Sequence, residues 1–127
     1  MNTSITAHAK FSAAQMSASF TTPLTIIPAQ GSGAVIWPKS VTLIYKAESG
    51  SAVVGGNATT VTLNSNTVCS QDFNGLTAST MYRKANALST AVAATANKAL
   101  VLNTPTADPT FYGAVEVYVE YDLINIA

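Results

Sequence analysis

The last stretch of the chain, from Gly113 to Ile126, constrains the fold more than any other part of the sequence. Apolar and polar residues alternate through most of it (GAVEVYVEYDLINI). A period of two places successive side chains on opposite faces of a β-strand. The pattern predicts a strand with a core face of Val115, Val117, Val119, Tyr121 and Leu123 and a solvated face of Glu116, Tyr118, Glu120 and Asp122.

A second long apolar stretch runs from Pro23 to Glu48 (PLTIIPAQGSGAVIWPKSVTLIYKAE). Pro23 suits the first position of a strand, because proline has no N–H to donate there. The turn Gly31-Ser32-Gly33 separates two β-branched runs. We do not expect this turn to bind phosphate, since a strand pattern follows it where a phosphate cradle needs a helix N-terminus. We expect this stretch and the C-terminal strand to share one core.

Shorter elements are expected between these two stretches and before them. Ser12 followed by Gln15 has the spacing of a capping box and predicts a helix from Ser12 to Ser19. Strands are predicted at Thr59 to Leu63 and Lys98 to Leu102, with a turn at Asn64-Ser65-Asn66. The remaining predictions are a Gly-rich loop from Ser49 to Asn57 with a tight turn or bulge at Gly55-Gly56, and an irregular connection from Phe73 to Ala96 with one helical turn near Gly75 to Met81.

These elements define the expected fold class. Strands joined by turns and loops, without regular alternation with helices, predict an all-β and mainly antiparallel fold. We expect a β-sandwich or jelly roll with one or two short helices. Residues 1–10 are expected to form an N-terminal arm and residues 11–127 a single β-sandwich domain, since 127 residues suffice for one core.

The charge composition limits the classes of partner. Charged residues make up 9% of the chain, and six basic residues balance six acidic ones. Such a chain has no long-range field to attract nucleic acid or an anionic membrane. No apolar run approaches the roughly 20 residues of a membrane helix, and no secretion signal is evident. We therefore expect a soluble protein made in a cytoplasm, without nucleic-acid or membrane partners.

The residues that carry chemistry are few and scattered. Glu116 and Glu120 lie about 13 Å apart along a strand, too far to share one metal ion without ligands from another strand. His8 falls in the expected arm, where we interpret it as a polar tail residue and not a general base. Cys69 is the only cysteine, so no intrachain disulfide forms and a small buried hydrophobe is expected. The sequence predicts no catalytic, metal or cofactor-binding residues and no enzymatic activity.

Two long runs carry a resemblance to a known class of proteins. TTPLTIIPAQGSGAVIWPKSVTLIYKAESGSAVVGG and KALVLNTPTADPTFYGAVEVYVEYDLINIA, preceded by the Ser12 to Ser19 helix, resemble small structural proteins encoded by tailed bacteriophages. In that group a pattern TPxxLxxAPGxGKxIxP precedes an apolar strand, a Gly-Gly turn and a closing Gly-x-x-x-Val-x-Val-x-Tyr strand. This chain departs from it at Gln30, where proline is usual, and at Ala34, where lysine is common.

The resemblance implies a virion component, and we expect a capsid decoration (cement) protein. Its expected partners are the major capsid protein and further copies of itself, as a homodimer or homotrimer on the capsid surface. The arm and the Ser49 to Asn57 loop are expected to reach neighbouring subunits. Trp37, Phe111 and Tyr112 could each lie in the core or at an interface. The predicted protein-contact residues are Ile5, His8, Trp37, Val53, Val54 and Tyr112.

Two other functions remain open at the level of the sequence. A tail or head-fibre adsorption module that binds host glycan or protein would gather Trp37, Tyr112 and Tyr118 in a shallow groove. A small enzyme would need a pocket that brings His8 or the Glu116 to Asp122 face close to a nucleophile. Either arrangement can be checked in the structure.

Overall fold

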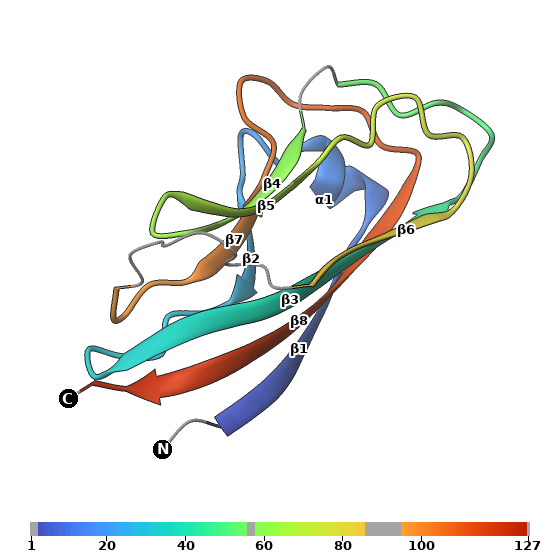
Figure 1. Cartoon of the computed structure of the whole chain (residues 1–127). Coiled ribbons are helices and arrows are strands. Elements are labelled where there is room, and N and C mark those ends of the chain that lie inside the picture. Colours follow the sequence, from blue (N-terminus) through green and yellow to red (C-terminus); the bar gives the residue numbers. More distant parts are fainter. Residues whose placement is uncertain (1–2, 56–57, 86–94, 127) are drawn as a thin grey trace.

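The computed structural model describes residues 3–55, 58–85 and 95–126. Its strands form two four-stranded antiparallel sheets that pack face to face, which is the predicted all-β sandwich (Figure 1). Sheet A has the order β1-β8-β3-β6, and sheet B has the order β2-β7-β4-β5. The elements are β1 (Thr3–Phe11), α1 (Ala13–Ser17), β2 (Leu24–Ile27), β3 (Ala34–Ala47), β4 (Thr59–Leu63), β5 (Asn66–Gln71), β6 (Thr80–Ala85), β7 (Leu100–Asn103) and β8 (Gly113–Asn125).

The long strands β3 and β8 form the centre of sheet A. They pair along almost their whole length, from Ala34 opposite Asn125 to Ala47 opposite Gly113. The register shifts between Pro38 and Ser40, and the pairing of β3 with β6 begins only at Ser40. Pro38 is opposite Tyr121 and lies where β3 has no second neighbour in the described chain, so its missing N–H costs no ladder hydrogen bond.

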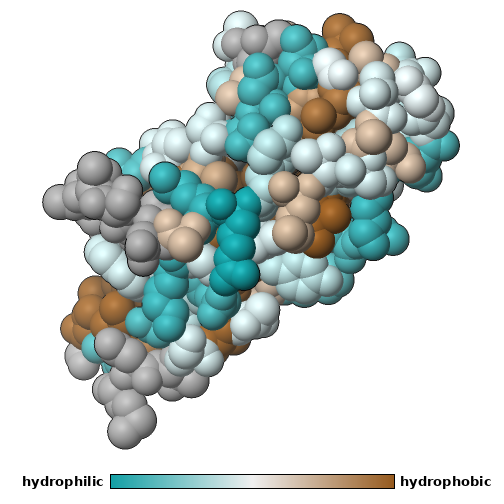
Figure 2. Space-filling view, turned by 45° about the vertical axis from the view of Figure 1, so that its right-hand side comes forward, coloured by the Kyte–Doolittle hydropathy of each residue, from teal (hydrophilic) through white to brown (hydrophobic). Residues whose placement is uncertain are grey.

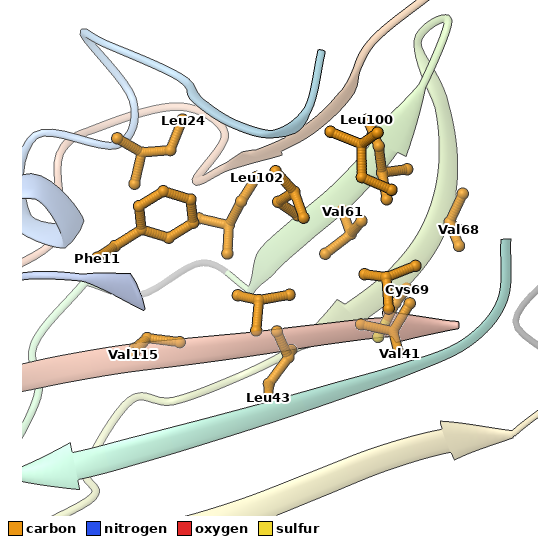
Figure 3. Close-up of a cluster of buried hydrophobic side chains, with 14 of the residues drawn as sticks. Phe11, Leu24, Val41, Leu43, Val61, Val68, Cys69, Leu100, Leu102 and Val115 are labelled. Atoms are coloured by element: carbon orange, nitrogen blue, oxygen red, sulfur yellow. The ribbon is translucent and has the colours of Figure 1, made fainter. Parts of the chain in front are cut away.

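The core lies between the two sheets. In Figure 3, Val41, Leu43 and Val115 of sheet A point toward the side chains of sheet B. Val61, Leu100 and Leu102 come from that sheet and are fully buried. Cys69 is also buried and packs in the same cluster, as predicted for a small hydrophobe, and this burial raises the pKa of its thiol. The core face predicted for the last strand is confirmed, with its three valines fully buried.

The short helix α1 closes one end of the sandwich. Ser12 and Gln15 form the predicted capping box, because each side chain bonds to the other residue's backbone N–H. Met16 is fully buried in the common core. None of the described helices is long and apolar enough to cross a membrane.

Buried hydroxyls and one carboxylate hold the segment after α1. The Ser19 hydroxyl donates to the Met16 carbonyl, at 2.7 Å, and can accept from the Thr104 hydroxyl, whose oxygen lies 2.9 Å away. Asp108 accepts the backbone N–H groups of Phe20 and Thr21 as well as the Thr21 hydroxyl. These bonds lower the pKa of Asp108 and join the helix to the loop that precedes β8.

Two expectations from the sequence are corrected. Residues 3–11, expected mostly as an arm, form β1, which pairs with β8 from Thr3 opposite Leu123 to Phe11 opposite Val115. The helical turn expected near Gly75 to Met81 is absent, and the chain there is irregular before it enters β6. The Gly55-Gly56 turn lies in part outside the described residues.

The two strands of the Pro23 to Glu48 stretch do not pair with each other. β2 belongs to sheet B and β3 to sheet A, so the turn at Gly31 passes the chain from one sheet to the other. Gly31 has φ +97°, a conformation that favours glycine. The stretch and the C-terminal strand do share one core, as expected.

Candidate interaction surface

The candidate interaction surface is the outer face of sheet A, formed by side chains that point away from sheet B. Cross-strand partners share a face, so the register places the outward residues of β8 beside those of its neighbours. We call this surface the outer face. Its residues include Ser4, Thr6, His8, Lys10, Trp37, Lys39, Ser40, Thr42, Ile44, Lys46, Met81, Arg83, Glu116, Tyr118, Glu120 and Asp122.

Glu116 is the centre of an ionic cluster on the outer face. Its Oε1 lies 2.9 Å from His8 Nε2, and its Oε2 pairs with Lys46 Nζ. The His8 ring stacks on Tyr118 at a centroid distance of 4.3 Å. The Glu116 side chain is only 10% exposed, because β1 and β3 lie on either side of β8. The carboxylate, predicted to be solvated, is therefore largely covered by its partners.

The other carboxylates of the outer face are paired in the same way. Glu120 Oε1 accepts from the Ser40 hydroxyl, at 3.0 Å, and from Arg83, at 3.3 Å. Asp122 lies 3.4 Å from Lys39 Nζ. Positive and negative charges on the outer face are thus matched locally. Figure 2 shows hydrophobic and hydrophilic residues interspersed on the side of the molecule that it presents. The result is a broad surface without a strong field of one sign.

Two of the predicted contact residues lie on this surface and one lies behind it. His8 is not a tail residue, since it belongs to an ordered strand and is bound to Glu116. Trp37 is half-buried on β3 opposite Asp122. Ile5 points to the other side of β1, where it packs against the core at the edge of the sandwich.

The remaining predicted residues lie at one end of the sandwich. Val53 is 2% exposed and its backbone bonds to Gly75 and Leu76, so it belongs to the core and is not available for contact. Val54 is 58% exposed and pairs with Thr110, two residues before the exposed Tyr112. Phe111, which the sequence left open, is buried in the core.

The surface has open depressions beside both sheets. One of about 530 Å³ lies over sheet B and is lined by residues such as Thr62, Asn64 and Lys98. Another of about 500 Å³ lies beside Lys10 and Lys46, at the start of α1. Among the residues that the structure describes, no group of three or more His, Cys, Asp or Glu could hold a metal ion. In that same part of the chain, the side-chain contacts of His8 are Glu116 and Tyr118.

The Glu116 cluster makes stability depend on pH. Hydrogen bonds from Lys46 and His8 lower the pKa of Glu116 below its ordinary value. A carboxylate with a lowered pKa stabilises the fold above its unfolded pKa of about 4.3, and this stabilisation disappears as the pH falls through the folded pKa. We expect Glu116→Gln to lower the thermal midpoint at neutral pH and to converge with the wild type in acid.

Glu48→Gln serves as the control, because it removes the same charge from an exposed position. Thermal unfolding followed by circular dichroism between about pH 3 and pH 7 covers the unfolded pKa of a glutamate. If the thermal midpoints of Glu116→Gln and wild type differed by the same amount at every pH in this range, the ionised carboxylate would not be what stabilises the fold.

Comparison with protein-family models, with curated proteins and with solved structures finds no match to this chain. The resemblance to structural proteins of tailed bacteriophages therefore stays a prediction from the sequence.

Proposed function

We propose that the protein is a non-enzymatic capsid decoration (cement) protein of a tailed bacteriophage. It would be made in the cytoplasm of the bacterial host and bind the outer surface of the shell. Its partners would be the major capsid protein and further copies of itself. The β-sandwich architecture is compatible with this role, and the sequence resemblance supplies the assignment to phage particles.

The composition of the outer face is the structural observation that supports the proposal best. Protein interfaces are enriched in aromatic residues, methionine and arginine and depleted of lysine, aspartate and glutamate, and a charge that is already paired costs less to bury than a lone one. The outer face presents Trp37, Tyr118, Met81 and Arg83. The carboxylates of this face, on Glu116, Glu120 and Asp122, are held in ion pairs. A face of this kind suits short-range contact with another protein. Modest contacts repeated over a symmetric shell would add up through avidity.

The adsorption module is supported less well by the same geometry. It requires Trp37, Tyr112 and Tyr118 in one groove. Trp37 is opposite Asp122, ten residues along β8 from Tyr112, which corresponds to about 30 Å. The three aromatic side chains therefore do not gather in one groove, and the outer face favours contact with a flat partner.

The copy number of the protein in purified particles tests the proposal. Quantitative mass spectrometry against the major capsid protein should find hundreds of copies per particle. A handful of copies at a vertex or tail would favour the adsorption module, and absence from particles would contradict both functions.

Two exposed hydrophobic residues offer a matched pair of variants for the same measurement. Met81 is 64% exposed on the outer face, and Val54 is 58% exposed at the end of the sandwich. If the outer face meets the shell, Met81→Ser should lower the occupancy of particles and Val54→Ser should leave it unchanged. The reverse result would assign shell binding to the Val54 end.

A further inference from the structure

The strand β1 leaves one long edge of sheet A open. It has nine residues and runs in unbroken register along β8, its only hydrogen-bonded neighbour in the described chain. An open edge strand presents a row of free N–H and C=O groups, which can pair with another strand. In Figure 1, β1 forms the outermost strand on its side of the molecule.

The hydrogen bonds at the ends of β8 identify the backbone groups on this edge. Ile126 N–H donates to Gly33, and Tyr112 C=O accepts from Glu48, so even-numbered residues of β8 face β3 and odd-numbered residues face β1. The pairing of β1 with β8 therefore uses the backbone N–H and C=O groups of the odd-numbered residues of β1. The residues whose N–H and C=O groups point to the open edge are Ser4, Thr6, His8 and Lys10.

The other sheet edges carry features that discourage pairing. β6 has six residues and includes both Arg83 and Lys84. β2 has four residues and a register shift, and β5 pairs with β4 across another shift. Short edges, charges and bulges are the means by which proteins protect their edges. Among the edges of the described chain, β1 is the longest and its pairing has no such shift.

We propose that two copies of the protein pair through β1, antiparallel, about a two-fold axis at Ala7. Only a register centred on Ala7 gives every open-edge residue a partner, because Ser4 then meets Lys10 of the partner subunit and Thr6 meets His8 of the partner subunit. Four such residue pairs form about eight backbone hydrogen bonds, two in each pair. A second copy of the chain therefore fits this edge with every open backbone group paired, and we take it as the occupant.

The side chains of β1 are compatible with this register. It sets the two Lys10 side chains at opposite ends of the interface, so that no like charges are directly opposed. On the inner side, Ile5, Ala7 and Ala9 are half-buried hydrophobic residues packed against the core. Pairing would place Ile5 beside Ala9 of the partner subunit and cover the part of these side chains that remains exposed. Sheet A would continue across the axis as an eight-stranded sheet.

This inference deepens the self-association proposed above and rests on that part of the proposed function. Its test measures mass and cross-linking in solution without particles. Failure of shell binding and failure of β1 pairing would therefore be seen in separate experiments.

Cysteine cross-linking tests the register. At the axis, Ala7 meets Ala7 of the partner subunit as a non-hydrogen-bonded pair, with Cα atoms about 4.5 Å apart, within the range of a disulfide. Ala7→Cys should form a covalent dimer on mild oxidation. Ala9→Cys is the matched control, because the two copies of residue 9 would lie about 13 Å apart along the strands. Equal cross-linking of both variants, or of Ala9→Cys alone, would overturn the proposed register.

Solution mass tests the role of the open backbone edge. Wild type should sediment with twice its chain mass of 13.1 kDa. Thr6→Pro removes an N–H that faces the open edge, so it should shift the mass to that of one chain while the β-sheet circular dichroism is kept. Met81→Pro is the control, since Met81 N–H faces the opposite open edge by the same alternation, and it should remain dimeric.

Three outcomes would overturn the proposal. They are a wild-type mass of one chain at all concentrations, a mass of three chains, and a folded Thr6→Pro variant that remains dimeric. Because Ala7→Cys changes only a small side chain, its cross-linking decides the question even if Thr6→Pro fails to fold.

Discussion

Replacing Phe73 by alanine should lower the free energy of unfolding by about 3–5 kcal/mol, the range for removing a buried aromatic ring. Phe73 is 1% exposed and lies in the loop between β5 and β6. Its ring packs edge-on against Tyr82, at 5.5 Å between centroids, and against Phe111, at 5.7 Å. Denaturant unfolding followed by circular dichroism would measure the loss.

Phe20→Ala is the matched control for this prediction. It removes the same ring from a position that is 46% exposed, and surface changes usually alter stability by less than about 0.5 kcal/mol. Similar losses in the two variants would mean that the aromatic cluster around Phe73 does not hold this end of the sandwich together.

Gly113→Ala should be strongly destabilising for a different reason. A Cβ atom at Gly113 would lie 2.0 Å from the Lys46 carbonyl oxygen and 2.9 Å from the Ala47 Cα, both of them backbone atoms of β3. The end of β3 would have to move away from the start of β8, because a backbone cannot move aside as a flexible side chain can. We expect a loss of about 3 kcal/mol or more, at the upper end of overpacking effects.

Gly50→Ala is the control for the backbone contact. A Cβ atom at Gly50 meets nothing within 4 Å, and its φ lies outside the left-handed region. Thermal unfolding of both variants would compare them directly. Wild-type stability in Gly113→Ala would show that β3 and β8 approach less closely at this end than the structure indicates.

The elements predicted correctly from sequence are those with strong local signals. The period-two alternation after Gly113 defines β8, and the Ser12–Gln15 spacing defines the start of α1. The turn at Asn64 and Ser65 joins β4 to β5, and both residues adopt positive φ. In each case the side chains that decide the structure are neighbours in the sequence.

Elements defined by distant partners were predicted less well. In β1 the inward residues are Ile5, Ala7 and Ala9, and alanine has little preference for strands, so the alternation carries a weak hydrophobic signal. Its pairing with β8 supplies the missing stabilisation. The spacing of Leu76 and Met81 similarly indicated a helical turn, whereas pairing with β3 makes β6 extended.

The outer face was predicted only in part. The alternation of β8 correctly separates Glu116 from the core valines, yet it cannot say which strands flank β8. The burial of Glu116 follows from its two neighbours, since His8 and Lys46 reach it from β1 and β3. Because these residues are far apart in the sequence, no local pattern connects them.

The pairing of the first strand with the last also determines the order in which the chain can fold. Thr3 pairs with Leu123, so β1 has no partner until β8 has left the ribosome. β3 can pair with β6 before its longer ladder with β8 forms, and β4 and β5 are joined by a tight turn and can also pair early. Synthesis at about 5–20 residues per second leaves β1 without its partner strand for several seconds. Closure of sheet A therefore depends on contacts of high sequence separation, which are slow to form.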